Sequence, residues 1–366
     1  MIGVFVGSTE AYAGKSLACI VLGLRLQQEG RKVGYFKPLG FLPARIEGQV
    51  VDEDAAFIRE VLELPDPLSD LSPVIANDDL YRRALEGGKE AGVGGETCLP
   101  SSSLAERITQ AYARLSPGRE VMLVGGLGAI PVTGKALGLE ARQLVELLDC
   151  RAVLVGKYDS ERSVDPIFAS RDALGARLAG LLLNDIPADR LPFVRERVIP
   201  CLEAAGIRVF GAMPHDPVLR SVSVGELATH LNAEMLCCAE QREQLVEHFV
   251  VGAMNVESAL RYFRRLPNKA VITGGDRSDI QLAALETASK CVVLTGDLRP
   301  SSRVLTHAQE LHIPLLLARE DTLSVVDRIE WLLGRVRIRE RAKITRACEL
   351  AREHVDFAAL WSALGV

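Results

Sequence analysis

The triplet Gly14-Lys15-Ser16 contains the residue types that point most directly to chemistry in this sequence. It stands between a short apolar segment and a longer segment with an apolar stripe, which is the order of a strand, a loop and a helix. In such a loop, consecutive backbone N–H groups wrap a phosphate at the start of a helix. The lysine adds a positive charge, and the serine hydroxyl binds Mg²⁺. The alternative is a glycine-rich turn with an incidental lysine, and the order of the elements favours the phosphate site.

Thr9 stands where the standard phosphate loop, GxxxxGK[ST], has its first glycine. Gly7 lies two residues earlier in the chain. The loop is therefore either a longer working form or the remnant of one, and the residues alone leave this choice open.

Short runs of Val, Ile and Leu alternate with longer amphipathic segments over the first part of the chain. This alternation predicts an α/β fold with a mostly parallel sheet and helices on both faces. The expected strands are residues 2–6, 33–36, 121–124, 152–155, 178–183 and 209–212. Residues 65–98, which are rich in Gly, Pro, Asp and Asn, are expected to form loops and short helices over a substrate pocket.

A second, smaller α/β unit is expected to begin near Ser221. Its expected strands are residues 249–253, 270–273, 291–294 and 313–317. Two of them open an internal repeat in which a strand is followed by Thr-Gly, Asp, Arg, Ser and a helix. The expected domains are residues 1–218, residues 219–332 and a helical appendage at 333–366, which could pack on either domain or on a second subunit.

The composition narrows the class of protein. The chain has 366 residues, of which 48% are hydrophobic and 25% are charged, so two buried cores are expected. The formal net charge of −5 and the dispersed Lys and Arg residues argue against nucleic acid as a partner. Apolar runs are too short for a membrane helix, and the eight cysteines show neither a CxxC pair nor zinc-site spacing. We therefore expect a soluble cytoplasmic protein.

The GSTE string at residues 7–10, the GKS triplet and the VGYFKP string at residues 33–38 resemble the dethiobiotin synthetase branch of P-loop proteins. Over roughly residues 1–332, the chain more closely resembles the N-terminal part of long bacterial phosphotransacetylases, where a dethiobiotin-synthetase-like domain precedes a DRTGG domain. The synthetase branch uses extended loops, so the resemblance implies a working loop despite Thr9. It further implies an ATP site with Mg²⁺ and a homodimer.

The resemblance also assigns roles to residues beyond the loop. Lys37 approaches substrate and phosphate, and Asp54 helps to hold Mg²⁺. Asn184 reads the adenine base next to Asp185, and Pro214 closes the nucleotide pocket. The alternatives are a helix N-cap for Asp54 and turn formation for Asn184 and Asp185. The resemblance thus implies catalytic Lys15 and Lys37, metal ligands Ser16 and Asp54, and a nucleotide-binding set of Thr9, Gly14, Lys15, Ser16, Asn184, Asp185 and Pro214.

Gly125 departs from the synthetase pattern, which has a glutamate after the strand that matches residues 121–124. In the synthetases this glutamate completes the magnesium site. Losing a hard oxygen ligand weakens metal binding and the charge neutralisation on which phosphoryl transfer depends. We therefore expect nucleotide binding with slow or absent catalysis. A glutamate at this position should raise turnover unless Gly125 needs a positive φ.

Arg277 lies in the string ITGGDRSDI, whose glycines allow a tight turn before the next helix. Together with GAMNVESALRYF upstream, this string resembles the DRTGG domain, which is similar in layout to nucleotide-sensing CBS modules. Arg277 would then stand beside a helix N-terminus, where an anion is favoured. The alternative is a capping network in which Arg277 pairs with a carboxylate. The expected effector site comprises Asp276, Arg277, Ser278 and, from the other half of the repeat, Arg299.

The sequence therefore predicts an ATP-binding P-loop domain followed by a regulatory DRTGG domain, with weak or no catalysis. One alternative is an ATP-dependent ligase that activates a carboxylate, related to dethiobiotin synthetase and the cobyrinate amidotransferases. The other alternative is a structural module with an empty loop. Phosphotransacetylase activity is not expected from this chain alone, because in the long enzymes it belongs to a further domain after the DRTGG unit.

Overall fold

The computed structural model describes residues 1–87, 101–130, 132–333 and 340–366. The chain divides into two compact units, of which the first comprises Met1–His215 with Arg339–Val366 and the second comprises Asp216–Ile338. Cys98, residues 88–98 of the predicted loop segment and residues 334–339 of the predicted appendage lie outside the described residues. Each unit has a sheet of its own.

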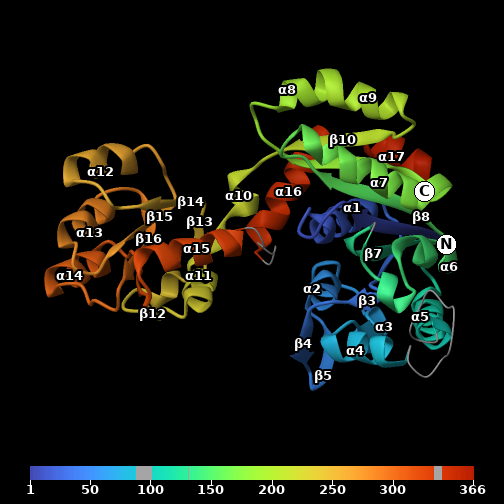
Figure 1. The fold of residues 1–366 in the computed structure, drawn as a ribbon, viewed down its shortest axis with the longest axis horizontal. Coiled ribbons are helices and arrows are strands. Elements are labelled where there is room, and N and C mark those ends of the chain that lie inside the picture. Colours follow the sequence, from blue (N-terminus) through green and yellow to red (C-terminus); the bar gives the residue numbers. More distant parts are fainter. Residues whose placement is uncertain (88–100, 131, 334–339) are drawn as a thin grey trace. The chain divides into compact units, whose positions relative to one another are not determined.

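The first unit is built on a parallel sheet of six strands: β1 (Ile2–Ser8), β2 (Val33–Phe36), β7 (Val121–Ala129), β8 (Cys150–Lys157), β9 (Leu178–Ile186) and β10 (Val209–Pro214). Their order across the sheet is β10-β9-β8-β1-β7-β2 (Figure 1). In the register of β1, Gly3 lies beside Met122 on one side and beside Cys150 on the other. Val4 and Phe5 in β1 are fully buried, as expected for a strand that is covered on both faces.

Helix α1 (Lys15–Gln28) packs on β1, β2 and β7, and the C-terminal helices α16 (Arg341–His354) and α17 (Phe357–Leu364) pack on α1, β9 and β10. Val355 forms an isolated bridge with Gly211, which covers the edge strand β10. The described part of the C-terminal segment therefore packs on the first unit. The other elements of this unit are β3 (Leu39–Gly40), β4 (Pro43–Ile46), β5 (Gln49–Asp52), α2 (Glu53–Val61), α3 (Leu68–Leu71), β6 (Val74–Ile75), α4 (Asp78–Gly87), α5 (Ser101–Leu115), α6 (Ala141–Leu147), α7 (Val164–Leu174), α8 (Leu191–Phe193) and α9 (Ile199–Ala204).

The second unit contains a sheet with β12 (Glu234–Met235), β14 (His248–Val251), β15 (Lys269–Gly274), β16 (Ser289–Thr295) and β17 (Leu315–Leu317), in the order β12-β17-β16-β15-β14. Only β12 runs antiparallel to its neighbour within this sheet. One core cluster includes residues from α12 (Val256–Phe263), α13 (Ser278–Leu285) and α14 (Ser302–Glu310), and another includes residues from α11 (Val224–Leu231) and α15 (Thr322–Leu333). Short elements complete the unit: α10 (Pro217–Arg220), β11 (Val222–Ser223) and β13 (Leu245–Val246).

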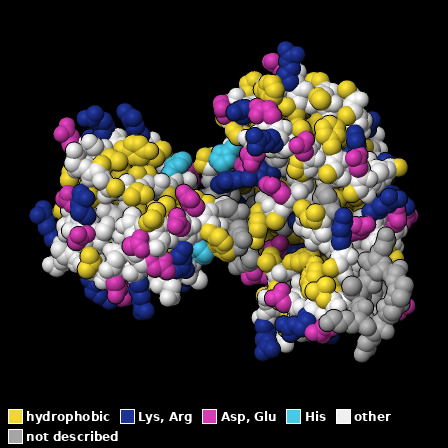
Figure 2. All heavy atoms as spheres, viewed as in Figure 1, with side chains coloured by type: hydrophobic (Ala, Val, Ile, Leu, Met, Phe, Trp, Pro, Cys, Tyr) yellow, Lys and Arg dark blue, Asp and Glu magenta, His cyan; other side chains and the backbone are white. Residues whose placement is uncertain are grey.

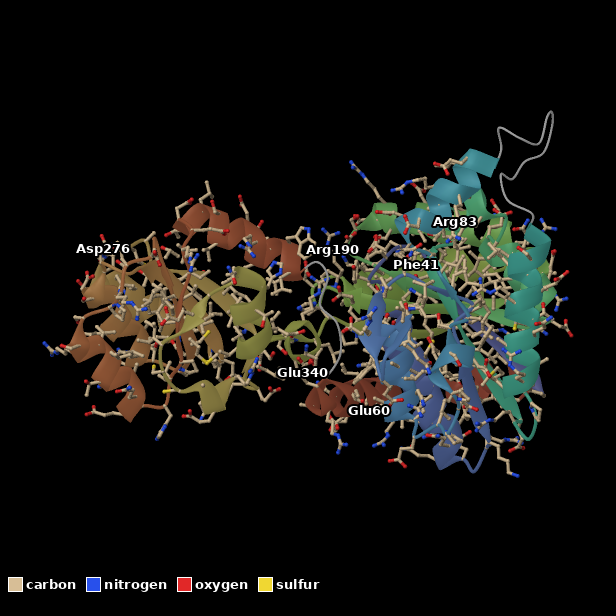
Figure 3. All side chains as sticks on the ribbon, turned by 90° about the horizontal axis from the view of Figure 1, so that it is seen from below. Phe41, Glu60, Arg83, Arg190, Asp276 and Glu340 are labelled. Carbon is tan, nitrogen blue, oxygen red and sulfur yellow. The ribbon has the colours of Figure 1, made fainter. Side chains whose placement is uncertain are left out.

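The predicted α/β class is confirmed, and a strand is present at each expected place. Some strands run further toward their carboxyl ends than predicted, and β7 continues through Gly125 to Ala129. Glycines in this part of β7 interrupt the apolar pattern, so the sequence does not indicate that the strand continues. The short strands that follow β2 were not predicted, because two to four residues give no periodic signal. Figure 3 labels Phe41, which lies between β3 and β4, and Glu60, which lies in α2.

The surface shows charges of both signs. On the face in Figure 2, basic and acidic side chains are interspersed over each unit, and no large patch of one sign stands out there. Within the described ranges, no helix has the length and apolar character needed to cross a bilayer. The cysteines that fall in the same ranges are all free thiols.

Lys269, at the start of β15, is fully buried, and its ammonium group has no hydrogen-bond partner in the described part of the chain. It lies 5.9 Å from the ring centre of Phe263, whose face attracts a cation. Burial lowers the pKa of Lys269 to about 8. The second unit therefore holds an ammonium group in its core that would be more stable in water.

Replacing Lys269 with Met should raise the free energy of unfolding of the second unit by about 1 to 3 kcal/mol at pH 7, because it removes a buried charge without a counter-ion. In the wild type, the unfolded chain keeps this proton up to the ordinary pKa of 10.5, so stability should rise with pH between about 8 and 10.5. Urea titrations followed by Trp331 fluorescence in a Trp361→Phe background measure both effects. Lys290→Met, at a partly exposed position of β16, is the control. Equal stability of Lys269→Met and the wild type at pH 7 would contradict this account.

Candidate functional site

The loop at residues 9–14 joins β1 to α1 and ends in a left-handed turn at Gly14, whose φ is 101°. A Cβ on Gly14 would collide with the side-chain nitrogen of Asn184, so glycine alone suits both the backbone and the space. Among the described residues, no side chain caps the N-terminus of α1. The first N–H groups of α1 therefore face the loop without a side-chain acceptor, which is the arrangement that a bound phosphate requires.

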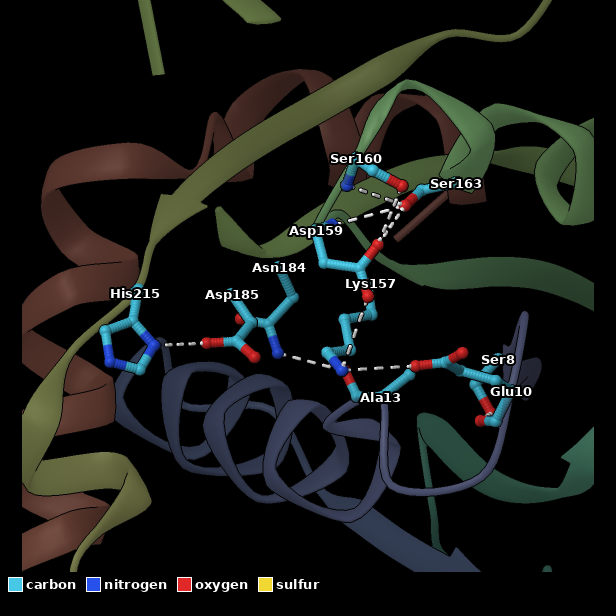
Figure 4. Close-up of polar contacts among 10 residues, drawn as sticks. All are labelled: Ser8, Glu10, Ala13, Lys157, Asp159, Ser160, Ser163, Asn184, Asp185 and His215. Carbon is cyan, nitrogen blue, oxygen red and sulfur yellow. Dashed lines mark hydrogen bonds and ion pairs between the residues drawn. The ribbon is translucent and has the colours of Figure 1, made fainter. Parts of the chain in front are cut away.

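Hydrogen bonds hold the loop against the neighbouring strands. The N–H of Thr9 donates to the carbonyl of Val155 in β8 at 3.1 Å. The side-chain amide of Asn184 donates to the carbonyl of Ala13 at 2.9 Å (Figure 4). Asn184 thus positions the loop from the end of β9, while its predicted contact with adenine stays a prediction.

Lys37 lies directly after β2, where it is 6% exposed and surrounded by acidic side chains. Its ammonium nitrogen is 2.7 Å from a carboxylate oxygen of Asp52 and 3.5 Å from one of Asp54. Asp54 in turn accepts a hydrogen bond from the hydroxyl of Ser16 at 3.1 Å. The structure therefore brings Ser16, Lys37 and Asp54 together, although they come from α1, the end of β2 and the first turn of α2.

Asp52 was not singled out from the sequence, yet its carboxylate is fully buried in this cluster. It caps α2 by accepting from the N–H of Ala55 at 2.9 Å, and it also accepts from the N–H groups of Phe41 and Leu42. Asp52, and not Asp54, is therefore the N-cap of α2. The carboxylate of Asp54 contacts the loop instead. The signal was present, because an Asp immediately before Glu-Asp-Ala-Ala is a pattern that starts helices.

Lys15, the first residue of α1, has no carboxylate within ion-pair distance among the described residues. Burial, followed by the positive charge of Lys37, lowers the pKa of Lys15 from its ordinary value of 10.5. The charges of Asp54 and Asp52 act in the opposite direction and more weakly. A partly buried cation without a counter-ion among the described residues favours the binding of an anion beside it.

Asp185 and Pro214 lie at the ends of the neighbouring strands β9 and β10. Asp185 has a left-handed backbone with a φ of 59°, and its carboxylate oxygen lies 2.7 Å from Nδ1 of His215 (Figure 4). Pro214 pairs with Ile186 in β9. The left-handed backbone of Asp185 agrees with the alternative considered for this residue, in which it forms a turn. Its contact with His215 was not predicted. A role of either residue in nucleotide binding stays a prediction.

Gly125 lies inside the extended strand β7 and does not have a positive φ, so the backbone reason considered for this glycine is wrong. A Cβ at Gly125 would instead collide with the hydroxyl of Tyr35 and lie 3.1 Å from Cζ of its ring. Space, rather than backbone conformation, excludes a side chain here. A Gly125→Glu exchange alone would therefore displace Tyr35 before it could supply a carboxylate.

The residues of the site fit Mg²⁺ only in part. The Ser16 hydroxyl and the Asp54 carboxylate are hard oxygen donors of the type that Mg²⁺ prefers. Position 125 supplies no donor, and the described ranges contain no group of three or more His, Cys, Asp or Glu side chains that could hold a metal ion. The donors fit a cation that is held mainly by phosphate oxygens and water.

In the second unit, the two arginines of the repeat have different partners. Arg277 directly precedes α13 and pairs with Asp279, with 3.1 Å between Nε and Oδ1. It also donates to the carbonyl of Met254 at 3.2 Å. Arg299 pairs with Glu234 at 2.8 Å. The pairing of Arg277 with a carboxylate, which was the alternative to an anion site, is present.

The two halves of the repeat also differ at their turns. Ser278 is the first residue of α13, and the exposed Asp276, labelled in Figure 3, precedes it in the turn. Helix α14 begins at Ser302, three residues after Arg299, whereas α13 begins immediately after Arg277. An anion that used both arginines would have to compete with two ion pairs. The effector site at residues 276–278 and 299 stays a prediction.

Comparison with known families identifies both parts of the chain. Residues 3–223 match the family described as AAA domain, which is 221 of the 366 residues. The chain belongs to the AAA domain family. This AAA domain is a P-loop domain of the dethiobiotin synthetase type, and residues 226–332 match the DRTGG domain. The resemblance inferred from the sequence is therefore confirmed.

Individual proteins of known name are also similar to this chain. The phosphate acetyltransferase of Synechocystis sp. is 23% identical over 373 residues, covering 96% of this chain and 50% of the relative. The ATP-dependent dethiobiotin synthetase of Methanococcus vannielii is 24% identical over 212 residues, covering 57% of this chain and 91% of the relative. Among solved structures, the MinD cell division protein of Aquifex aeolicus aligns with a TM-score of 0.36 and 16% identity, over 60% of this chain and 84% of that one. The chain spans about half the length of the phosphate acetyltransferases, matching their N-terminal half.

Replacing Asp52 with Asn should lower the free energy of unfolding of the first unit by about 3 kcal/mol, because Lys37 would stay buried without its nearest negative charge. Asp54→Asn is the matched control, since this carboxylate is partly exposed and should contribute less than about 1 kcal/mol. Urea unfolding followed by Trp361 fluorescence in a Trp331→Phe background measures both. The account fails if the two substitutions cost the same.

Proposed function

We propose that the AAA domain binds ATP at residues 9–16 and that the chain is a nucleotide-dependent regulatory protein with slow or no catalysis. The observation that carries the proposal is Lys15, a partly buried lysine without a carboxylate partner among the described residues, at the start of α1, where no described side chain caps the helix. An ATP phosphate would supply the missing negative charge. The N–H groups of the first turn would donate to the same phosphate oxygens.

The neighbouring residues could bind the magnesium ion and the terminal phosphate of a nucleoside triphosphate. Ser16 and Asp54 are the donors available to a magnesium ion, which would neutralise charge between the phosphates. Lys37 is held in place by its ion pair with Asp52, and we propose that it contributes positive charge near the phosphates. Because position 125 offers no third donor, we propose that the transfer or hydrolysis of the terminal phosphate is slow.

We assign the regulatory part of the proposal to the DRTGG domain, which follows the AAA domain in the chain. The relatives include phosphate acetyltransferases and an ATP-dependent synthetase, so a role in metabolism is proposed for this chain as well. A homodimer and the effector site at residues 276–278 and 299 belong to the proposal. The ligase alternative ranks second, because the donor set for Mg²⁺ is incomplete.

Replacing Lys15 with Ala should weaken the binding of ATP with Mg²⁺ by about tenfold or more, because a charge-assisted contact to phosphate is lost. The free energy of unfolding should not fall, since Lys15 forms no ion pair with the residues that the structure describes. Calorimetry on the full chain measures the affinity, and urea unfolding measures the stability. Lys32→Ala, at an exposed position just before β2, is the control. Unchanged ATP affinity in Lys15→Ala would remove the assignment of this loop.

A further inference from the structure

Tyr35 in β2 lies directly beside Leu123 of β7, and its hydroxyl reaches the space next to Gly125. Leu123 faces α1, since its Cδ1 lies 3.3 Å from the place where a Cβ on Gly23 of α1 would be. Side chains alternate between the faces of a sheet, so residues 123 and 125 share the face that α1 covers. The ring of Tyr35 therefore runs along this face toward the carboxyl end of the sheet, where the phosphate loop and Lys37 lie.

The hydroxyl of Tyr35 is enclosed and without a partner. Tyr35 is 2% exposed, and its hydroxyl has no hydrogen-bond partner among the residues that the structure describes. Hydroxyl groups inside folded proteins normally have a partner. This one is therefore suited to receive a ligand.

The hydroxyl also stays protonated. Burial raises the pKa of Tyr35 well above its ordinary value, and the neighbouring Cys19, Asp52 and Asp54 act in the same direction. A neutral phenol is a hydrogen-bond donor, whereas a carboxylate at the same place would accept or bind a cation. Tyr35 thus replaces an anionic metal ligand with a neutral donor.

The positive and negative charges of the side chains near the Tyr35 hydroxyl are equal in number. Lys15 and Lys37 bring two positive charges, and Asp52 and Asp54 bring two negative charges. A carboxylate at position 125 would make the group net negative, and a phosphate could then enter only with a divalent cation. With a neutral hydroxyl there, no third carboxylate opposes a phosphate at the two lysines.

We propose that Tyr35 determines the ligand specificity of the nucleotide site, in that its hydroxyl donates a hydrogen bond to a phosphoryl oxygen and allows the nucleotide phosphate to bind without a divalent cation. This inference rests on the proposed nucleotide binding and adds a ligand class to it, the metal-free nucleoside polyphosphate. Gly125 and Tyr35 act as a pair, because the glycine leaves the space that the hydroxyl fills.

Calorimetric titration of the full chain with ATP, once with EDTA and once with Mg²⁺, tests this inference. The wild type should bind ATP in EDTA within about threefold of its affinity in Mg²⁺, because the protein itself supplies the balancing charges. Tyr35→Phe keeps the ring and removes the hydroxyl, and it should weaken binding in EDTA about tenfold. Tripolyphosphate, which lacks the nucleoside, should show the same loss. Tyr112→Phe, at a buried tyrosine near Gly3, is the matched control and should bind like the wild type.

The outcomes separate the inference from the function on which it rests. If the wild type binds ATP only with Mg²⁺, or if Tyr35→Phe binds ATP and tripolyphosphate as the wild type does, the inference is overturned and the nucleotide site stands. If the wild type binds no ATP in either buffer, the proposed function fails as well. Should Tyr35→Phe not fold by near-ultraviolet circular dichroism, the comparison of EDTA and Mg²⁺ in the wild type still decides.

Discussion

Lys37 and Asp52 form a buried ion pair, and the geometry of the phosphate site depends on how this pair is satisfied. Removing two charges from water is costly unless hydrogen bonds complete what the ion pair leaves open. Asp52 meets this condition by accepting from Lys37 and from the N–H groups of Phe41, Leu42 and Ala55. The end of β2, the turn at residues 41–42 and the start of α2 are thereby fixed to one carboxylate. Asp54, two residues further on, is left to contact Ser16 at the loop.

The two lysines of the site differ in their counter-ions. Lys37 has two carboxylates within 4 Å, whereas Lys15 has none among the described residues. Lys37 thus has its counter-ions within the protein, whereas under the proposed function the counter-ion of Lys15 is the bound phosphate. Gly125 and Tyr35 add to this difference, because together they replace a further carboxylate with a neutral hydroxyl. The arrangement favours an anion at the loop more than it favours a catalytic metal ion.

Local patterns in the sequence were enough to predict the fold class, the longer strands of the two main sheets and the loop. Runs of Val, Ile and Leu followed by Gly14-Lys15-Ser16 place a strand, a turn and a helix in order, because each depends on neighbouring residues. The contacts that define the site do not leave such a pattern. Asp52 meets Lys37 across 15 positions, and Tyr35 meets Gly125 across the boundary between two strands that are far apart in the chain. Arg277 and Arg299 looked equivalent in the repeat, but their partners come from elements that the repeat does not include.

The central claim is that this site binds ATP and turns it over slowly. The rate of phosphate release from ATP by the full chain with Mg²⁺, at ATP concentrations that saturate binding by calorimetry, tests the claim most directly. The account predicts saturable binding with a turnover well below about 1 per second, the lower end of ordinary enzyme rates. Turnover at or above that rate would show that the site completes its catalytic machinery despite Gly125, and would contradict the account.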